Sequence, residues 1–344
     1  MASAQDFIMA TPSSDACWRA IVLFGRNVAS YKFALAEALL TLPPNGSDFV
    51  KLEDLATPFA HAVCRHLKAN PKQGTSQSSQ FLESCRKFNA GKLGGEELQA
   101  ATVRLGFVNV VDAFHVVNQG EVPRRFFIDE RTSNSGIRLT EEFRTLMSSS
   151  QSGSLPKEIE ARWRLVETSW SIGLGRKLIE VDQTSTETML VAAASSGRRV
   201  SVTSARHALN GYQKGRCFYC YRDLALGGDG LNAADVDHFL PHTLMTRGKA
   251  RALDSVWNLV LACRECNRGS GGKFALLPTT VFLERLSRRN EFYISSHHPL
   301  GETIQMQTGD TTHGRNSFLK DAYQAALNVL IHTWEPKARG DCAL

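Results

Sequence analysis

Apolar residues in the first half of the chain recur at helical spacing. In the segment 13–44, apolar side chains three and four positions apart define one helical face: Phe24, Val28, Tyr31, Leu35 and Leu39. Cap-type serines open this segment and Pro43 ends it, so we expect one long helix. Similar but weaker patterns predict helices over 51–69, 79–90 and 95–104. The first half of the chain is therefore predicted to be a set of helices that pack on one another.

Other patterns follow in the middle of the chain and at its end. The run 124–143 is typical of a short strand, a turn and the start of a helix. The segment "SSSQSGSLP" (148–156) is polar and rich in small residues, which indicates a domain boundary. Helical patterns return over 156–174 and 204–215. Near the end, an amphipathic helix that Pro336 terminates is predicted from Tyr323, Leu327, Leu330 and Trp334.

Two segments of the second half have the character of strands. "DVDHFLPH" (235–242) crowds four ionisable side chains beside a proline, and the short apolar run "WNLVLAC" (257–263) fits a buried strand. "RECN" (264–267) then begins a helix. We therefore expect an α+β, mainly α fold. Its parts are a helical accessory region (1–150), a helical linker (151–203), a compact module (204–280) and a C-terminal helical extension (281–344).

Positive charge is concentrated around the two strand-like segments. The chain has a formal net charge of +6, and residues 201–290 hold 13 Lys or Arg against 7 Asp or Glu. The rest of the chain is therefore balanced. A basic surface attracts polyanions, of which nucleic acid is the commonest, although a solvated charged face has the same composition.

The sequence shows no secretory signal and no apolar run of membrane-spanning length. A cytoplasmic protein with reduced thiols is therefore expected. Four of its cysteines have no spacing pattern and are interpreted as core or incidental residues: Cys17, Cys64, Cys85 and Cys342.

The other four cysteines form two pairs, "CFYC" (217–220) and "CREC" (263–266). Two such pairs predict a structural zinc site with Cys217, Cys220, Cys263 and Cys266 as ligands, because each tight turn directs two sulfurs at one point. The 42 residues between the pairs exceed the spacing of about 15–20 in a zinc ribbon. The pairs must therefore bracket a larger element, which contains "DVDHFLPH".

Residues 205–275 resemble the HNH endonucleases of the ββα-metal fold, in the zinc-stapled branch similar to phage T4 endonuclease VII. The resemblance rests on "DVDHFLPH", "WNLVLACRECN" and the two cysteine pairs, in that order. It implies that His238 is the general base and that Asp237 and Asn267 hold a catalytic Mg²⁺ or Mn²⁺ ion. It also implies that Asn258 holds the catalytic loop. Asp235 and His242 are left open between supporting and incidental roles.

The chemistry of these residue types fits phosphodiester hydrolysis. A neutral histidine can take a proton from water near neutral pH, and hard divalent cations prefer oxygen ligands. Adjacent Asp237 and His238 would point to opposite faces of a regular strand, and a bend at Pro241 is one way to bring both to one cleft. Seven basic residues are expected to contact DNA phosphates: Arg216, Arg247, Lys249, Arg251, Arg264, Arg268 and Lys273.

The sequence thus favours a metal-dependent DNA endonuclease, with a restriction or anti-phage role expected by analogy with bacterial relatives that carry an extra domain. The alternative is a zinc-containing subunit that binds nucleic acid within a larger complex. The helical region 1–150 is expected either to dock a protein partner or sensor or to bind DNA.

Overall fold

The computed structural model describes residues 13–24, 29–43, 47–74, 78–117, 120–172, 179–183, 187–193, 199–226, 230–247, 253–296 and 298–337. Contacts divide the chain into two compact units, one of which is Pro12–Leu174 and the other of which includes Gly175–Leu344. We call them the helical unit and the cysteine unit.

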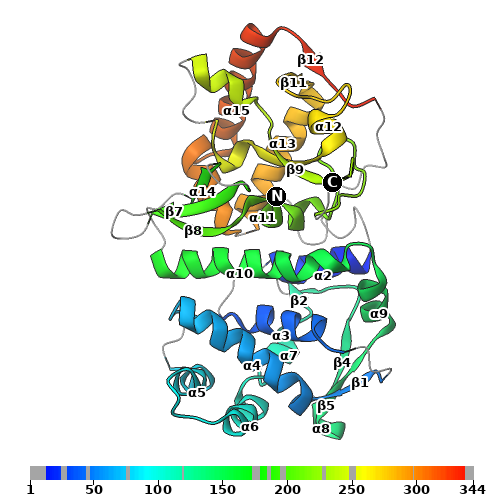
Figure 1. Ribbon diagram of the computed structural model, residues 1–344, viewed down its shortest axis with the longest axis vertical. Coiled ribbons are helices and arrows are strands. Elements are labelled where there is room, and N and C mark those ends of the chain that lie inside the picture. The colour runs from blue at the N-terminus through cyan, green and yellow to red at the C-terminus, as the bar shows by residue number, and fades with distance from the viewer. Residues whose placement is uncertain are drawn as a thin grey trace. The chain divides into compact units, whose positions relative to one another are not determined.

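The helical unit contains a small sheet beside its helices (Figure 1). The helices are α2 (Ser14–Leu23), α3 (Tyr31–Leu40), α4 (Leu52–Ala69), α5 (Gln80–Asn89), α6 (Gly95–Leu105), α7 (Val110–Ala113), α8 (Arg131–Asn134), α9 (Glu141–Ser148) and α10 (Leu155–Ile172). The sheet is antiparallel, in the order β1 (Phe49–Lys51), β5 (Gly136–Leu139), β4 (Phe127–Glu130), and β2 (Val116–Val117) pairs with β3 (Gly120–Glu121). Aromatic side chains build the core, where Trp18 meets Phe114 and Phe126 edge to face.

The single helix expected over 13–44 is two helices, so that prediction is wrong. α2 ends at Leu23, Phe24 is extended, and α3 begins at Tyr31. The apolar spacing continues across the interruption, which is why the pattern suggested one helix. The three weaker patterns correspond to α4, α5 and α6.

The division between the units lies after the polar segment 148–156, not within it. α10 begins inside that segment and packs on α2 and α3. A buried ion pair, with Arg19 Nε 2.8 Å from Glu158 Oε2, joins α10 to α2. The polar composition of 148–156 therefore marks a surface turn between two helices of one unit.

The cysteine unit begins with an antiparallel sheet in the order β6 (Ile179–Asp182), β7 (Met189–Ala193), β8 (Arg199–Ser204). The elements that follow are α11 (Ala205–Gln213), β9 (Ala234–His238), β10 (Leu259–Cys263), α12 (Arg264–Arg268), β11 (Leu277–Pro278), α13 (Thr280–Ser295), α14 (Pro299–Thr308), α15 (Thr312–Leu330) and β12 (Thr333–Trp334). Short 3-10 turns cover His242–Arg247 and Val256–Asn258.

The entirely helical linker predicted over 151–203 is wrong in its second part, where β6, β7 and β8 lie. These strands are short and rich in β-branched residues, and short apolar runs do not distinguish a strand from a helix by periodicity. The C-terminal helix also ends earlier than predicted. Ile331 adopts a left-handed conformation after α15, and Trp334 belongs to β12.

The fold is α+β and mainly helical, as predicted. In the cysteine unit, α11 and α12 pack on β9 and β10, whereas α13 and α14 pack on the 3-10 turn Val256–Asn258 that leads into β10. Arg289 of α13 is buried and donates to the Leu259 carbonyl (2.8 Å) and the Trp257 carbonyl (2.7 Å), which fixes the approach to β10. Among the described helices, none combines the length and the apolar character needed to cross a bilayer.

Candidate active site

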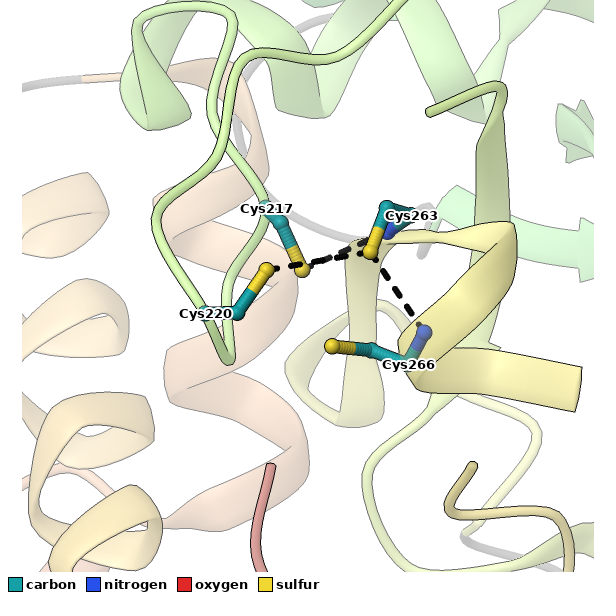
Figure 2. Close-up of side chains that lie close together, drawn as sticks. All are labelled: Cys217, Cys220, Cys263 and Cys266. Atoms are coloured by element: carbon teal, nitrogen blue, oxygen red, sulfur yellow. Dashed lines mark hydrogen bonds between the residues drawn. The ribbon is translucent and has the colours of Figure 1, made fainter. Parts of the chain in front are cut away.

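The four paired cysteines come together in one buried cluster (Figure 2). Cys217 and Cys220 lie in a turn after α11, whereas Cys263 ends β10 and Cys266 lies in α12. Their sulfur atoms lie within 4.8 Å of one another, and those of Cys220 and Cys263 are 3.7 Å apart. Tetrahedral zinc with Zn–S bonds of about 2.3 Å separates its sulfurs by about 3.8 Å. The cluster could therefore hold a metal ion such as zinc.

The hydrogen bonds around the sulfurs also suit metal-bound thiolates. The backbone N–H of Cys263 donates to Cys217 Sγ (3.3 Å), and that of Cys266 donates to Cys263 Sγ (3.4 Å). Burial raises the pKa of the Cys217 thiol well above its usual value, whereas hydrogen bonds from the neighbouring thiols lower the pKa of Cys220. Four thiolates this close together would repel one another, and a bound metal ion could offset that repulsion.

Two antiparallel strands and a short helix carry the other candidate residues. In the register of β9 and β10, Asp237 lies opposite Val260 and His238 lies opposite Leu259. α12 follows β10 directly, and the side chain of Cys263 accepts a hydrogen bond at its N-terminus. The cysteine cluster thus sits at the junction between β10 and α12.

Both carboxylate oxygens of Asp237 are engaged inside the protein. Lys273 Nζ lies 3.0 Å from Oδ1, and the Tyr219 hydroxyl donates to Oδ2 at 2.7 Å. Burial and the neighbouring Asp237 charge raise the pKa of Tyr219, so its hydroxyl remains a donor. Lys273 also donates to the His238 carbonyl at 2.9 Å. Its ammonium is therefore buried against Asp237 and does not lie at a surface where it could contact phosphate, contrary to the prediction.

His238 ends β9 in a setting separate from that of Asp237. Its Nε2 lies 3.1 Å from Asp254 Oδ1 and 3.0 Å from Gln183 Nε2. Gln183 also donates to Asp254 Oδ1 at 2.9 Å. The exposed His242 ring lies edge to face with the His238 ring, with centroids 5.6 Å apart. The side chains of Asp237 and His238 thus have different partners, as expected for neighbours on a regular strand.

Asn258 is buried and ties the segment after His238 to the approach to β10. Its Oδ1 accepts from the Leu240 N–H at 2.8 Å, and its Nδ2 donates to the carbonyls of Leu240 (3.0 Å) and Leu253 (2.9 Å). These three bonds tie the turn that follows β9 to the segment before β10.

Asn267 contacts Asp235 rather than Asp237. Its Nδ2 donates to Asp235 Oδ2 at 3.2 Å, and Arg268 Nε donates to the same oxygen at 2.9 Å. Asp235 and Asp237 lie on one face of β9, two residues apart. The carboxylate and amide oxygens of this face suit a hard cation, but Lys273 and Arg268 now supply the positive charge beside them.

The structure describes only some of the other basic residues that were predicted to contact phosphate. Arg216 and Arg264 are partly exposed and Arg268 is 55% exposed at its side chain. Lys249 and Arg251 lie outside the described residues, as does the side chain of Arg247.

Sequence reasoning missed three residues that contact the candidate site: Tyr219, Asp254 and Gln183. Tyr219 lies between two zinc-type cysteines, and a tyrosine inside such a turn has no sequence signature of its own. Asp254 and Gln183 meet His238 from 16 and 55 positions away. Only the fold of β6 beside the approach to β10 brings them together.

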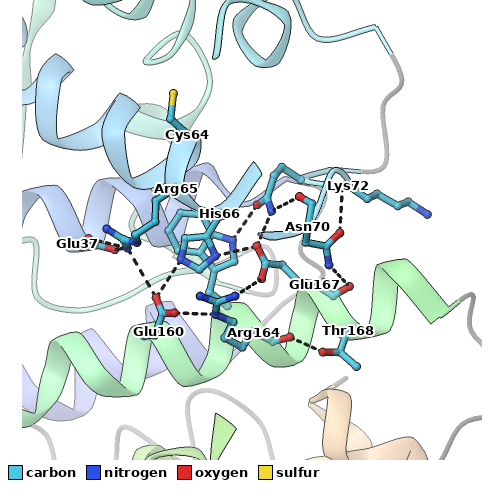
Figure 3. Close-up of polar contacts among 12 residues, drawn as sticks. Glu37, Cys64, Arg65, His66, Asn70, Lys72, Glu160, Arg164, Glu167 and Thr168 are labelled. Carbon is cyan, nitrogen blue, oxygen red and sulfur yellow. Dashed lines mark hydrogen bonds and ion pairs between the residues drawn. The ribbon is translucent and has the colours of Figure 1, made fainter. Parts of the chain in front are cut away.

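A second charged cluster lies in the helical unit, where the His66 ring of α4 is buried against α10 (Figure 3). Its Nδ1 lies 2.8 Å from Glu167 Oε1, and its Nε2 lies 2.9 Å from Glu160 Oε2. Burial alone would lower the His66 pKa, but the hydrogen bonds to these glutamates outweigh it and raise the pKa. The ring stacks on Trp163 with centroids 3.6 Å apart.

The spacing of Glu37, His66 and Glu160 would also admit a metal ion. Arg65 Nη2 donates to both oxygens of Glu37 (2.9 and 2.8 Å), and Arg164 Nε donates to Glu160 at 2.7 Å. Because these carboxylates already have cationic partners, we interpret the cluster as an ion-pair network around a protonated His66.

Comparisons with known proteins leave the site to be interpreted from its own residues. A scan against protein-family models, a search of curated proteins and a search of solved structures each found no match.

Proposed function

We propose that this protein is a metal-dependent endonuclease of the HNH type that hydrolyses DNA phosphodiester bonds. The observation that carries the proposal is the placement of chemistry-bearing residues on β9, β10 and α12. Asp237 and His238 end the first strand, Asn258 precedes the second, and Asn267 follows the last cysteine on the helix. The cysteine cluster provides a rigid anchor for that helix once it binds zinc.

In this proposal His238 is the general base. It takes a proton from a water molecule, the water oxygen attacks phosphorus, and the bond from phosphorus to the 3′ oxygen breaks. Asp237 and Asn267 would hold a Mg²⁺ or Mn²⁺ ion, which supplies charge stabilisation for the phosphate and the leaving oxygen. Lys273 must then give up its contact with Asp237 Oδ1, because its ammonium group and the metal ion would compete for the same carboxylate oxygen.

The basic charge of the cysteine unit supports a polyanionic substrate. The exposed Arg268 and the partly exposed Arg216 and Arg264 would contact phosphates without reading base sequence. A restriction or anti-phage role, with a partner docking on the helical unit, is the biological setting that we propose for this activity.

One observation favours a second candidate, a subunit that binds nucleic acid without cutting it. Asp237 is already neutralised by Lys273 and bonded to Tyr219, as in a site that takes up no divalent ion. In that case the zinc cluster and the basic surface would keep their roles and His238 would be a structural residue.

Cleavage of supercoiled plasmid DNA distinguishes the two candidates. Wild-type protein, His238→Ala and the control His313→Ala are incubated with Mg²⁺, Mn²⁺ or EDTA. His313 lies at the exposed start of α15 and controls for loss of a histidine. We expect nicking or linearisation by wild type and by His313→Ala with a divalent ion, and a loss of about 10²–10⁴-fold for His238→Ala.

The binding-only candidate predicts a different result. Wild type and His238→Ala would then shift the plasmid equally in a gel at low salt, and the plasmid would stay supercoiled in every metal. Equal cleavage by wild type and His238→Ala would instead place any nuclease activity at another site.

A further inference from the structure

The contacts of His238 Nε2 constrain which ring nitrogen carries the proton. Nε2 faces Asp254 Oδ1 at 3.1 Å and Gln183 Nε2 at 3.0 Å, and Gln183 Nε2 is itself 2.9 Å from Asp254 Oδ1. A carboxylate only accepts hydrogen bonds and an amide nitrogen only donates them. One imidazole nitrogen does not donate and accept at once, so only one of its two contacts is a hydrogen bond.

The two tautomers of the neutral His238 ring present different groups to the Asp254 carboxylate. If Nε2 carries the proton, it donates to Asp254, and Gln183 also donates to Asp254. If Nδ1 carries the proton, the Nε2 lone pair faces the Asp254 carboxylate, which is repulsive and forfeits a charge-assisted bond. Both arrangements allow two hydrogen bonds, but only the first makes the charge-assisted bond between the ring and Asp254 and avoids this repulsion. For Nδ1 of His238, the described part of the chain records no protein partner.

We infer that Asp254 and Gln183 are a positioning pair that fixes His238 as the Nε2–H tautomer and leaves Nδ1 as the basic nitrogen. This inference rests on the proposed function only in assigning Nδ1 a catalytic use. Gln183 donates to Asp254 and so holds its carboxylate in place, while Asp254 accepts the Nε2–H and sets the rotation of the ring.

The pair has a second consequence for proton transfer. When Nδ1 takes a proton from water, the water O–H bond breaks, an N–H bond forms and the ring becomes an imidazolium. Asp254 then faces that positive charge through the Nε2–H bond it already accepts. A side-chain exposure of 28% for Asp254 and 12% for His238 leaves this interaction only partly screened by solvent.

A single and a double variant test whether Asp254 and Gln183 position the His238 ring. Asp254→Leu removes the acceptor, so that Gln183 can donate to the Nε2 lone pair, which favours the opposite tautomer. The double variant Asp254→Asn/Gln183→Glu restores one carboxylate and one amide beside Nε2 with their places exchanged. The control is Asp321→Asn, a change at an exposed aspartate of α15. All variants are full-length and zinc-loaded.

The first readout is the protonation of the two ring nitrogens of His238, followed by ¹⁵N NMR with histidine-labelled protein. His238→Gln provides the assignment. With the ring neutral, we expect Nε2–H in wild type and in Asp321→Asn, Nδ1–H in Asp254→Leu, and Nε2–H again in the double variant. An Nδ1–H ring in wild type, or no change in Asp254→Leu, overturns the inference whether or not the protein cuts DNA.

The second readout is plasmid cleavage. We expect Asp254→Leu to lower kcat by about 10²–10⁴-fold with KM changed by less than about twofold, and the double variant to recover part of that loss. If wild type cuts no DNA while the NMR result is as expected, the proposed function fails and the positioning pair stands. If cleavage depends on His238 but the tautomer does not depend on Asp254, the pair fails and the nuclease stands.

Discussion

Asp237 is the residue whose surroundings say most about the candidate site. It is buried, and its carboxylate lies between the Lys273 ammonium and the Tyr219 hydroxyl. Removing a charged group from water is costly unless it is paired, so Asp237 and Lys273 depend on each other in this structure. The same pairing makes Lys273 a competitor of any divalent ion for Asp237.

Replacing Lys273 therefore tests how this carboxylate is held. We expect Lys273→Met to lower the free energy of unfolding by about 3–5 kcal/mol, because it leaves Asp237 buried without a cation. Arg268→Met breaks an exposed pair with Asp235 and should cost less than about 1 kcal/mol. Urea unfolding of the zinc-loaded proteins measures both. Added Mg²⁺ should raise the melting temperature of Lys273→Met more than that of wild type, and equal losses for the two variants would argue against a buried Asp237–Lys273 pair.

At the residue scale, the sequence predicts a site best where the residues that form it are close together along the chain. The two cysteine pairs could be recognised because each pair is local, and the structure brings them into one cluster. Asp254 and Gln183 could not be predicted, because their contact with His238 depends on how β6 lies beside the approach to β10. Lys273 was predicted at a surface because its buried partner could not be inferred from composition.

Among the elements, α4 and α10 of the helical unit are joined by a charge network around His66 (Figure 3). His66 bonds Glu160 and Glu167, which lie two turns apart on α10, and Trp163 between them stacks on its ring. Arg164 supports Glu160 from the same helix. The network should therefore contribute to helix packing only while His66 is protonated and the glutamates are ionised.

These protonation states give the packing a defined pH range. The His66 pKa is raised above 6.5, so its contribution is fully present below about pH 6.5 and is lost as pH rises through the folded-state pKa. Bonds to His66 outweigh burial and lower the Glu160 pKa from 4.5 to about 2, so its contribution is present above about pH 4.5 and is lost as pH falls toward 2. The network is strongest between these limits.

Hydrogen exchange of α4 and α10 checks this range in wild type and His66→Gln. The excess exchange of the variant should be larger at about pH 5.5 than at about pH 8.5, with the two proteins compared at the same pH. His313→Gln, in the other unit, is the control and should match wild type in these helices at both pH values. A difference between wild type and His66→Gln that does not change with pH would contradict a protonated His66.

Helices and strands were predicted correctly where the local pattern of apolar residues was strong. The strand 259–263 and the helix after it were predictable because a short apolar run ends at a cysteine pair. The β6–β8 sheet was missed because its strands are only four to six residues long, and such short runs give a weak periodic signal. The interruption between α2 and α3 was missed because the helical spacing of apolar residues carries across it.

For the whole molecule, the division into two units implies that loss of the metal ion would destabilise the cysteine unit and not the helical unit. The cysteine cluster lies inside the unit that includes Gly175–Leu344 and ties the turn after α11 to the start of α12. No residue of the helical unit belongs to it. Binding free energy of a structural zinc ion is folding free energy, so its removal should loosen the cysteine unit.

We expect about one zinc ion per chain by elemental analysis, and its loss in Cys266→Ser. After chelation, hydrogen exchange should rise over α11, β9, β10 and α12, while the helices of Pro12–Leu174 keep the exchange rates of untreated protein. Cys64→Ala, which changes a buried cysteine outside the cluster, should retain its zinc. Zinc binding by Cys266→Ser, or unfolding of both units on chelation, would contradict this account.

The most direct test of the central claim is the initial rate of supercoiled plasmid cleavage by zinc-loaded protein in Mg²⁺ or Mn²⁺. We predict cleavage by wild type that EDTA abolishes and that falls by about 10²–10⁴-fold in His238→Ala, with zinc content unchanged. An intact plasmid with wild type in both metals, or equal rates for wild type and His238→Ala, would contradict a nuclease centred on His238.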